Sequence, residues 1–134
     1  MPSRVRLVRV VAALLVREER VLIARRVGPP AWAGWWEFPG GKVEAGEADA
    51  AAIERECEEE LGVRVRAGSA LVTVFHDEAD RRIAISVYRA RLVDGEPVAM
   101  AHDALAWVPI AALPTYKLLP ADVVVLQALA DAGH

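Results

Sequence analysis

GGKVEAGEADAAAIERECEEELGV, residues 40–63, carries the strongest pattern in the chain. The part from 48 to 61 is predicted to be a helix, because Ile53, Cys57 and Leu61 recur at the four-residue spacing of one helical face. Gly62 is expected to end the helix, since glycine is common just beyond helix C-termini. Negatively charged residues lie near the expected N-terminus, which favours a helix start there without a complete capping box.

Three glutamates of this helix, Glu56, Glu59 and Glu60, share a sector of about 100° beside the apolar face. Like charges one turn apart repel by roughly a few tenths of a kcal/mol per pair when they are exposed. A divalent cation such as Mg²⁺ or Mn²⁺ removes this cost, because hard cations bind carboxylate oxygens. The alternative interpretation is a solvated acidic helix face that holds no ligand.

The residues before the helix, Pro39-Gly40-Gly41, predict a tight loop in which the backbone can approach a ligand. Its carbonyl groups can bind a metal ion and its N–H groups can reach phosphate oxygens. Arg55 can orient a neighbouring carboxylate through its planar guanidinium group. The loop, the acidic helix and the glycine stop together favour a cradle for a metal ion and a phosphate.

The rest of the chain predicts strands with one central and one C-terminal helix, which indicates an α+β fold with a mixed sheet. Strong turn or loop signals separate these elements at residues 18–20, 28–34, 76–81 and 94–95. The predicted strands and helices outside the acidic segment cover residues 4–16, 21–27, 63–75, 82–92 and 105–108 as strands, 109–113 as a helical turn and 120–131 as a helix.

Length and composition narrow the class of protein. The 134 residues suit one compact domain spanning 1–134, and a net charge of −3 lacks the broad basic surface of a stable nucleic-acid binder. The single cysteine excludes an intrachain disulfide and a zinc cluster. The apolar run 10–16 is too short to cross a membrane, and residues 1–4 do not resemble a signal peptide, so we expect a cytoplasmic monomer or small homo-oligomer.

The spacing of Gly41, Glu47, Arg55-Glu56, Glu59-Glu60 and Gly62 resembles the Nudix box. Cys57 departs mildly from the larger apolar residue usual at its position. The preceding residues WEFPGGK, 36–42, resemble the MutT-type branch of the Nudix family, which hydrolyses nucleoside triphosphates. The similarity extends more weakly over nearly the whole chain and implies a Nudix-like α/β/α sandwich.

The resemblance also implies roles for the residues of the box. It implies Mg²⁺, with Mn²⁺ able to substitute, bound by the carbonyl of Gly40 and the carboxylates of Glu56, Glu59 and Glu60. Either Glu56 or Glu59 would accept the proton of the attacking water, and the sequence does not separate these two. Glu47 and Arg55 would form a pair that orients the ligands.

Residues 101–107, AHDALAW, depart from the MutT-type pattern. That branch often carries a further glutamate on this loop before the tryptophan that corresponds to Trp107, and alanine stands in its place here. His102 or Asp103 can substitute for the missing ligand, or water can. The alternative is that both are ordinary surface residues.

Several basic residues are candidates for phosphate binding. Arg26, with Arg25 beside it, ends a predicted strand, as a phosphate-binding arginine does in the MutT-type branch. Arg81 lies in the polar turn and Lys42 follows the glycine pair. The alternative for each of them is an exposed strand end or an ordinary loop residue.

Two residues are candidates for contact with a nucleobase. Phe38 is predicted to line the base pocket, whereas Trp36 is predicted to pack in the core. Asp122 occupies the place of a base-reading residue in the MutT-type branch. An ionised aspartate only accepts hydrogen bonds, which suits cytosine or guanine donors, including oxidised guanine. The alternative for Asp122 is a helix N-terminal residue stabilised by the helix dipole.

We therefore expect a hydrolase that acts on a small-molecule nucleotide and cleaves a nucleoside triphosphate to a monophosphate and pyrophosphate. A second hypothesis keeps this chemistry with another substrate, such as a nucleotide sugar or a dinucleoside polyphosphate, and the WEFPGGK flank argues mildly against it. A third is a catalytically silent module that binds a nucleotide, although all the glutamates of the box are retained.

Overall fold

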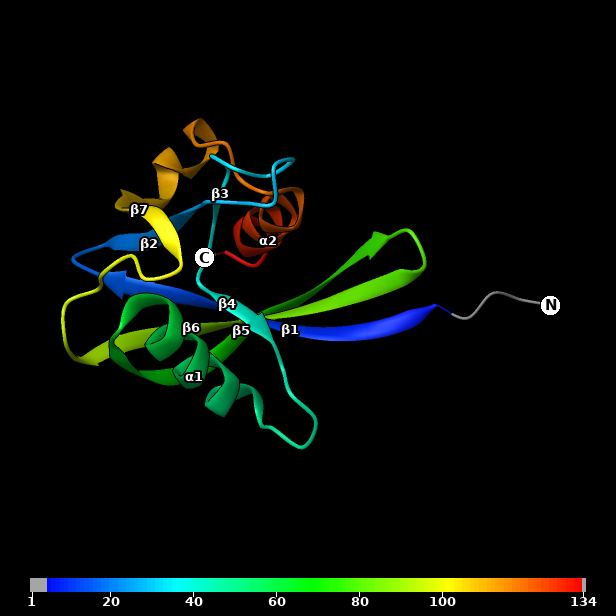
Figure 1. Cartoon of the computed structure of the whole chain (residues 1–134), viewed down its shortest axis with the longest axis horizontal. Coiled ribbons are helices and arrows are strands. Elements are labelled where there is room, and N and C mark those ends of the chain that lie inside the picture. The colour runs from blue at the N-terminus through cyan, green and yellow to red at the C-terminus, as the bar shows by residue number, and fades with distance from the viewer. Residues whose placement is uncertain (1–4, 134) are drawn as a thin grey trace.

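The computed structural model describes residues 5–133, so the strand start expected at residue 4 lies outside the described residues. Within these residues, four strands precede a helix in the middle of the chain, three strands follow it, and a 3₁₀ helix and a C-terminal helix come last (Figure 1). In chain order the elements are β1 Arg6–Arg17, β2 Arg20–Arg26, β3 Trp36–Glu37, β4 Gly40–Lys42, α1 Asp49–Leu61, β5 Arg64–Glu78, β6 Arg81–Asp94, β7 His102–Pro109, the 3₁₀ helix η1 Ile110–Thr115 and α2 Pro120–Asp131.

The sheet is mixed, as predicted. Its strand order is β3-β2-β1-β6-β5, with β4 also paired to β1 and β7 also paired to β2. The long β1 strand runs parallel to β6 and antiparallel to β4, and its end turns into β2. The glycine segment of β4 pairs with the middle of β1, the strand that joins both halves of the sheet.

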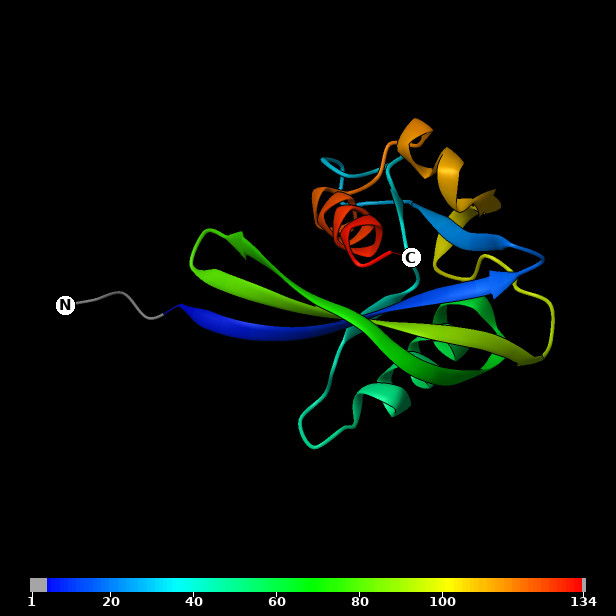
Figure 2. The ribbon, with the colours of Figure 1, turned by 180° about the vertical axis from the view of Figure 1, so that it is seen from behind.

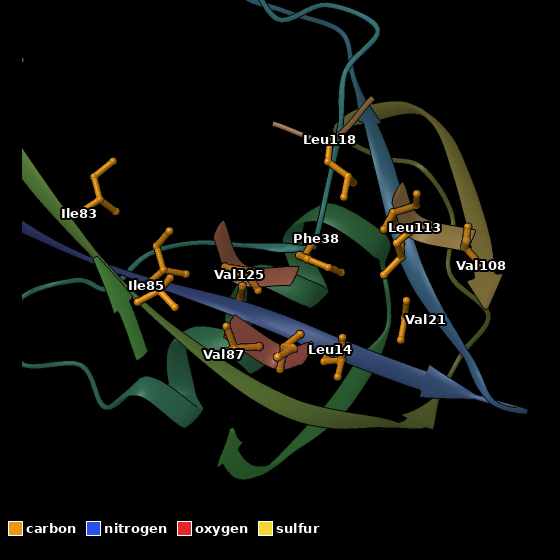
Figure 3. Packing of buried hydrophobic residues seen from close by; sticks show 14 residues of the cluster. Leu14, Val21, Phe38, Ile83, Ile85, Val87, Val108, Leu113, Leu118 and Val125 are labelled. Carbon is orange, nitrogen blue, oxygen red and sulfur yellow. The ribbon is translucent and has the colours of Figure 1, made fainter. Parts of the chain in front are cut away.

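The two helices cover opposite sides of the long strands, with α1 on one side and α2 on the other (Figures 1 and 2). Successive side chains of β1 therefore enter different cores. Val11 and Leu15 pack with Ile53 of α1, whereas Leu14 packs with Val125 of α2. Figure 3 shows the core on the α2 side, in which Phe38 packs with Leu14 and Val125. The α/β/α arrangement expected from the sequence is confirmed.

Helix α1 ends as predicted. Gly62 adopts a left-handed conformation with φ of 66°, and its N–H donates to the carbonyl of Glu58. Ile53, Cys57 and Leu61 are fully buried, so the apolar face identified from spacing is the face that packs on the sheet. Residue 48 precedes the helix without a side-chain cap.

The polar turns are shorter than the sequence indicated. Strand pairing continues to Glu78 and Arg81, so the turn expected at 76–81 contains only residues 79 and 80. Ion pairs explain this difference, because Arg82 binds Asp77 at 2.8 Å and Arg81 binds Glu78 at 3.3 Å across the hairpin. The turn at 18–20 is likewise reduced to two residues, since residue 20 already pairs with residue 17.

Within residues 5–133, neither helix combines the length and apolar character needed to cross a bilayer.

Candidate metal and nucleotide site

The glycine pair of β4 lets the acidic edge of α1 approach the sheet. A Cβ atom on Gly41 would lie 2.6 Å from Cδ of Glu56, so the Glu56 carboxylate occupies the space a side chain would need. A Cβ atom on Gly40 would lie 2.0 Å from the carbonyl oxygen of Val11. The expected tight loop is thus a short strand, because two residues without side chains can pair closely with β1.

Arg55 connects the loop after β4 to the helix. Its Nε and Nη2 donate to the two carboxylate oxygens of Glu47 at 2.8 and 2.9 Å. Its Nη1 donates to Glu56 at 2.8 Å, and its Nη2 donates to the carbonyl of Lys42 at 3.0 Å. The hydrogen bond from Arg55, with a second from the backbone of Glu44, lowers the pKa of Glu47 to about 2. The structure therefore brings together the predicted orienting pair and fixes one side of Glu56.

The three glutamates of the box have different surroundings. The side chain of Glu60 is 12% exposed and lies beside Glu56 and Glu37. Burial, followed by these neighbouring carboxylates, raises the pKa of Glu60 to about 9. The side chain of Glu59 is 58% exposed and reaches Arg55 only at 3.3 Å. Glu56 and Glu60 therefore converge at β4, whereas Glu59 lies at the solvent side.

A cluster of ligand atoms surrounds Glu60. One ligand atom each from Glu37, Glu60 and His102 lies within 4.8 Å of the others. Nε2 of His102 lies 2.8 Å from Glu37 and 3.9 Å from Glu60. Nδ1 of His102 is buried without a hydrogen-bond partner among the described residues. The two carboxylates and the Nε2 atom of His102 lie close together, and a divalent cation would fit among them because it would neutralise the repelling charges.

A cavity of about 470 Å³ opens beside this cluster. Its volume falls within the usual range for small-molecule sites. Its lining includes Glu37, Glu60 and His102 together with Phe38 and Asp122. The cavity therefore presents both acidic and apolar side chains to a ligand, as one with phosphates and an aromatic base requires.

Asp122 faces this cavity from the first turn of α2. It is 9% exposed and is the one charged residue in the buried class among residues 5–133. Burial, followed by the charge of Glu37, raises the pKa of Asp122, and a hydrogen bond from the backbone of Phe38 opposes the shift. Its place in the first turn of α2 agrees with the helix-dipole alternative, and its side chain also lines the cavity.

Trp36 packs against the core and Phe38 lines the cavity, as the sequence indicated, and Phe38 also belongs to the core. Trp36 is partly buried and packs edge-on against Tyr116, with ring centroids 5.4 Å apart. Phe38 lines the cavity and is also buried in the α2 core. Phe38 therefore forms part of both the cavity wall and the core.

Among the basic candidates, Arg26 reaches the cavity. It donates to Glu37 at 3.0 Å and to the carbonyl of Gly28 at 2.9 Å. Arg81 is not brought to this cavity, since it pairs with Glu78 and lines a separate depression near the hairpin end. Lys42 is exposed, and its carbonyl binds Arg55. The pairing of β5 with β6 continues to Arg81 and holds this residue at the end of the hairpin, so the structure does not support its predicted place in the substrate site.

His102 and Asp103, from the segment that lacks the usual glutamate, lie in different places. Asp103 binds Arg25 at 2.7 Å outside the cavity, whereas His102 lies inside it. Glu37 is the residue of the cluster that sequence reasoning left without a role. It was visible within WEFPGGK, but only the pairing of β3 with β2 places it near His102.

Comparisons with known proteins agree with this geometry. The family model described as NUDIX domain matches residues 10–128. The chain is 46% identical to the Mycobacterium tuberculosis protein named putative 8-oxo-dGTP diphosphatase 2, over 84% of this chain and 81% of that protein. It is 34% identical to the Escherichia coli CTP pyrophosphohydrolase, over 92% of this chain and 91% of that protein.

Solved structures show the same fold. The crystal structure of a MutT NUDIX hydrolase from Burkholderia pseudomallei matches with a TM-score of 0.81 and 35% identity, covering 92% of this chain and 98% of that chain. The family model, the relatives and the acidic cradle at β4 and α1 lead to one conclusion: the chain belongs to the Nudix family and is a MutT-type hydrolase.

Proposed function

We propose that this hydrolase converts a nucleoside triphosphate carrying an oxidised guanine or a cytosine to the monophosphate and pyrophosphate. The observation that carries the proposal is one cavity whose lining combines Glu37 and Glu60 with Phe38 and Asp122. The names of the two curated relatives, which refer to 8-oxo-dGTP and CTP, support the same pair of bases.

The base would be recognised by Phe38 and Asp122. Stacking of a base on an aromatic ring contributes roughly 1–3 kcal/mol. An ionised Asp122 accepts hydrogen bonds from the amino group of cytosine or from the N–H groups of guanine. Because burial raises the pKa of Asp122, the protonated carboxyl is also accessible, and it adds one O–H donor for a base carbonyl.

The phosphates would lie near β4 and the edge of α1. We propose that Mg²⁺, replaceable by Mn²⁺, is held by the carbonyl of Gly40 and by the carboxylates of Glu56 and Glu60, with Glu59 beside them. A bound divalent ion neutralises phosphate oxygens and lowers the pKa of an attacking water. Arg26 stands at the cavity wall to bind a phosphate oxygen, and Lys42 screens charge from outside.

Of the two candidate bases, the environment favours Glu59. The Glu56 carboxylate is held by Arg55 at 2.8 Å and packs against Gly41, so it is fixed in place. The Glu59 carboxylate is exposed and touches Arg55 only at the limit of a hydrogen bond. We therefore assign Glu59 to accept the water proton and Glu47 with Arg55 to position Glu56.

The partner in this proposal is a small-molecule nucleotide, without stable nucleic-acid or membrane binding. Cys57, the sole cysteine of the chain, is buried and unpaired, which fits the reducing cytoplasm. A monomer and a small homo-oligomer are both compatible with the proposed site.

A nucleotide panel with Mg²⁺ or Mn²⁺ tests the proposal. The wild-type protein should release pyrophosphate from a triphosphate of oxidised guanine or cytosine. Glu59→Gln should lose about 10²- to 10⁴-fold in kcat, the usual contribution of a general base, while binding persists. If the protein turned over only nucleotide sugars or dinucleoside polyphosphates, its substrate would belong to that class and not to the nucleoside triphosphates. Binding without any turnover in the wild type would identify a silent nucleotide-binding module.

A further inference from the structure

His102 is placed to contact a metal ion rather than only its protein neighbours. It is the first residue of β7, and its side chain is 5% exposed inside the cavity. Its Nε2 lies 2.8 Å from Glu37 Oε2 and 3.9 Å from Glu60 Oε1. The other oxygen of Glu37 is bound by Arg26 at 3.0 Å, so Glu37 is fixed from both sides.

The hydrogen bonding of His102 is incomplete. Buried side-chain polar atoms nearly always have a partner. Within residues 5–133, Nδ1 of His102 is the one buried side-chain nitrogen or oxygen atom that lacks one. An ion bound to Nε2 would leave Nδ1 unchanged, so the case for a ligand comes from Nε2, which faces two carboxylates.

The separations suit ligands of one ion. An octahedral ion with bonds of about 2.1 Å places adjacent ligand atoms about 3 Å apart and opposite ones about 4 Å apart. The 2.8 Å between Nε2 and Glu37, which is a hydrogen bond as it stands, and the 3.9 Å between Nε2 and Glu60 match these two values. Ala101, which precedes His102, also lines the cavity but offers no side-chain ligand atom.

We propose that His102 binds the divalent ion directly through Nε2, together with Glu60 and Glu37, and takes the place of the missing carboxylate. This inference rests on the proposed function for the presence of the ion. An imidazole ligand suits first-row transition ions better than it suits Mg²⁺, which prefers oxygen. The site should consequently hold Mn²⁺ more tightly than Mg²⁺, and His102 should account for much of the difference.

Pulsed EPR of the Mn²⁺-loaded protein tests this contact without substrate. The chain has three histidines, so the double variant His76→Ala/His134→Ala leaves His102 as the only imidazole. This variant should show ¹⁴N coupling typical of a bound imidazole. Adding His102→Ala or His102→Gln should abolish the coupling and weaken Mn²⁺ binding at least about 10-fold, with a smaller change for Mg²⁺.

The outcomes are distinct. An Mn²⁺ spectrum without imidazole coupling in the double variant would overturn the proposal, even if His102→Ala lowered affinity, because His102 would then only position Glu37. Asp103→Ala serves as a neighbouring control and should leave the coupling unchanged, since Asp103 binds Arg25. Failure of the nucleotide panel would refute the proposed substrate while leaving this Mn²⁺ coupling as a separate result.

Discussion

Replacing Gly41 by alanine should damage catalysis while leaving the fold nearly intact. The new Cβ atom would lie 2.6 Å from Cδ of Glu56 and 2.7 and 2.8 Å from its oxygens, whereas ordinary contact begins near 3.4 Å. The carboxylate must therefore retreat by about 0.7 Å, and a misplacement of about 1 Å at a reacting centre can cost about 10²-fold in rate. We expect Gly41→Ala to lose about 30- to 100-fold in kcat.

The cost in stability should be small, because the clashing atoms end a flexible side chain. Gly40→Ala is the matched control with the opposite behaviour. Its Cβ atom would lie 2.0 Å from the backbone oxygen of Val11, and its φ of 154° is unfavourable for other residues. Since the backbone cannot yield cheaply, overpacking should lower the free energy of unfolding by about 3 kcal/mol.

Two measurements separate these effects: pyrophosphate release at saturating nucleotide, and urea unfolding followed by circular dichroism. For Gly41→Ala we expect a reduced kcat with a change of less than about 1 kcal/mol in unfolding free energy. Wild-type kcat in Gly41→Ala would show that the position of Glu56 against β4 is unimportant. A loss of kcat that merely followed unfolding would refute the same reasoning.

Two further changes test the orienting and base-reading residues. Arg55→Lys keeps the charge but cannot bind Glu47, Glu56 and a carbonyl at once, so kcat should fall about 10- to 100-fold, and undiminished turnover would show that charge alone suffices. The pKa of Asp122 is raised by folding, so its ionisation lowers stability as pH rises from about 4 through the folded pKa. Asparagine cannot ionise, so the melting temperature of Asp122→Asn should fall less between pH 4 and pH 7 than that of the wild type. The same fall in both proteins would contradict a buried, cavity-facing carboxyl.

Local sequence patterns predicted the elements that depend on local spacing. Helix α1, its glycine end and the pairing of Glu47 with Arg55 all lie within one continuous segment, so their geometry follows from helical periodicity and a short loop. The sequence predicts a shorter hairpin of β5 and β6 than the structure has, because cross-strand ion pairs extend the pairing through polar residues that resemble a turn. The sequence shows which residues are charged, but it does not show which residue faces each of them on the neighbouring strand.

The cluster of Glu37, Glu60 and His102 shows a second limit. These residues come from β3, α1 and β7, and they meet only because β3 and β7 both pair with β2. Their long-range register leaves no periodic signal in the chain. The same reason explains Arg81, whose distance from the cavity depends on how far β5 and β6 continue their pairing.

Anomalous diffraction from crystals soaked in Mn²⁺ tests most directly whether the acidic edge of α1 holds a cation. We predict an anomalous peak between the carboxylates of Glu56 and Glu60, beside the carbonyl of Gly40, at oxygen distances typical of a bound ion. The peak should vanish in the double variant Glu56→Gln/Glu60→Gln. Well-ordered crystals of the wild-type protein with no peak at that position, at Mn²⁺ concentrations that support turnover, would contradict the metal site.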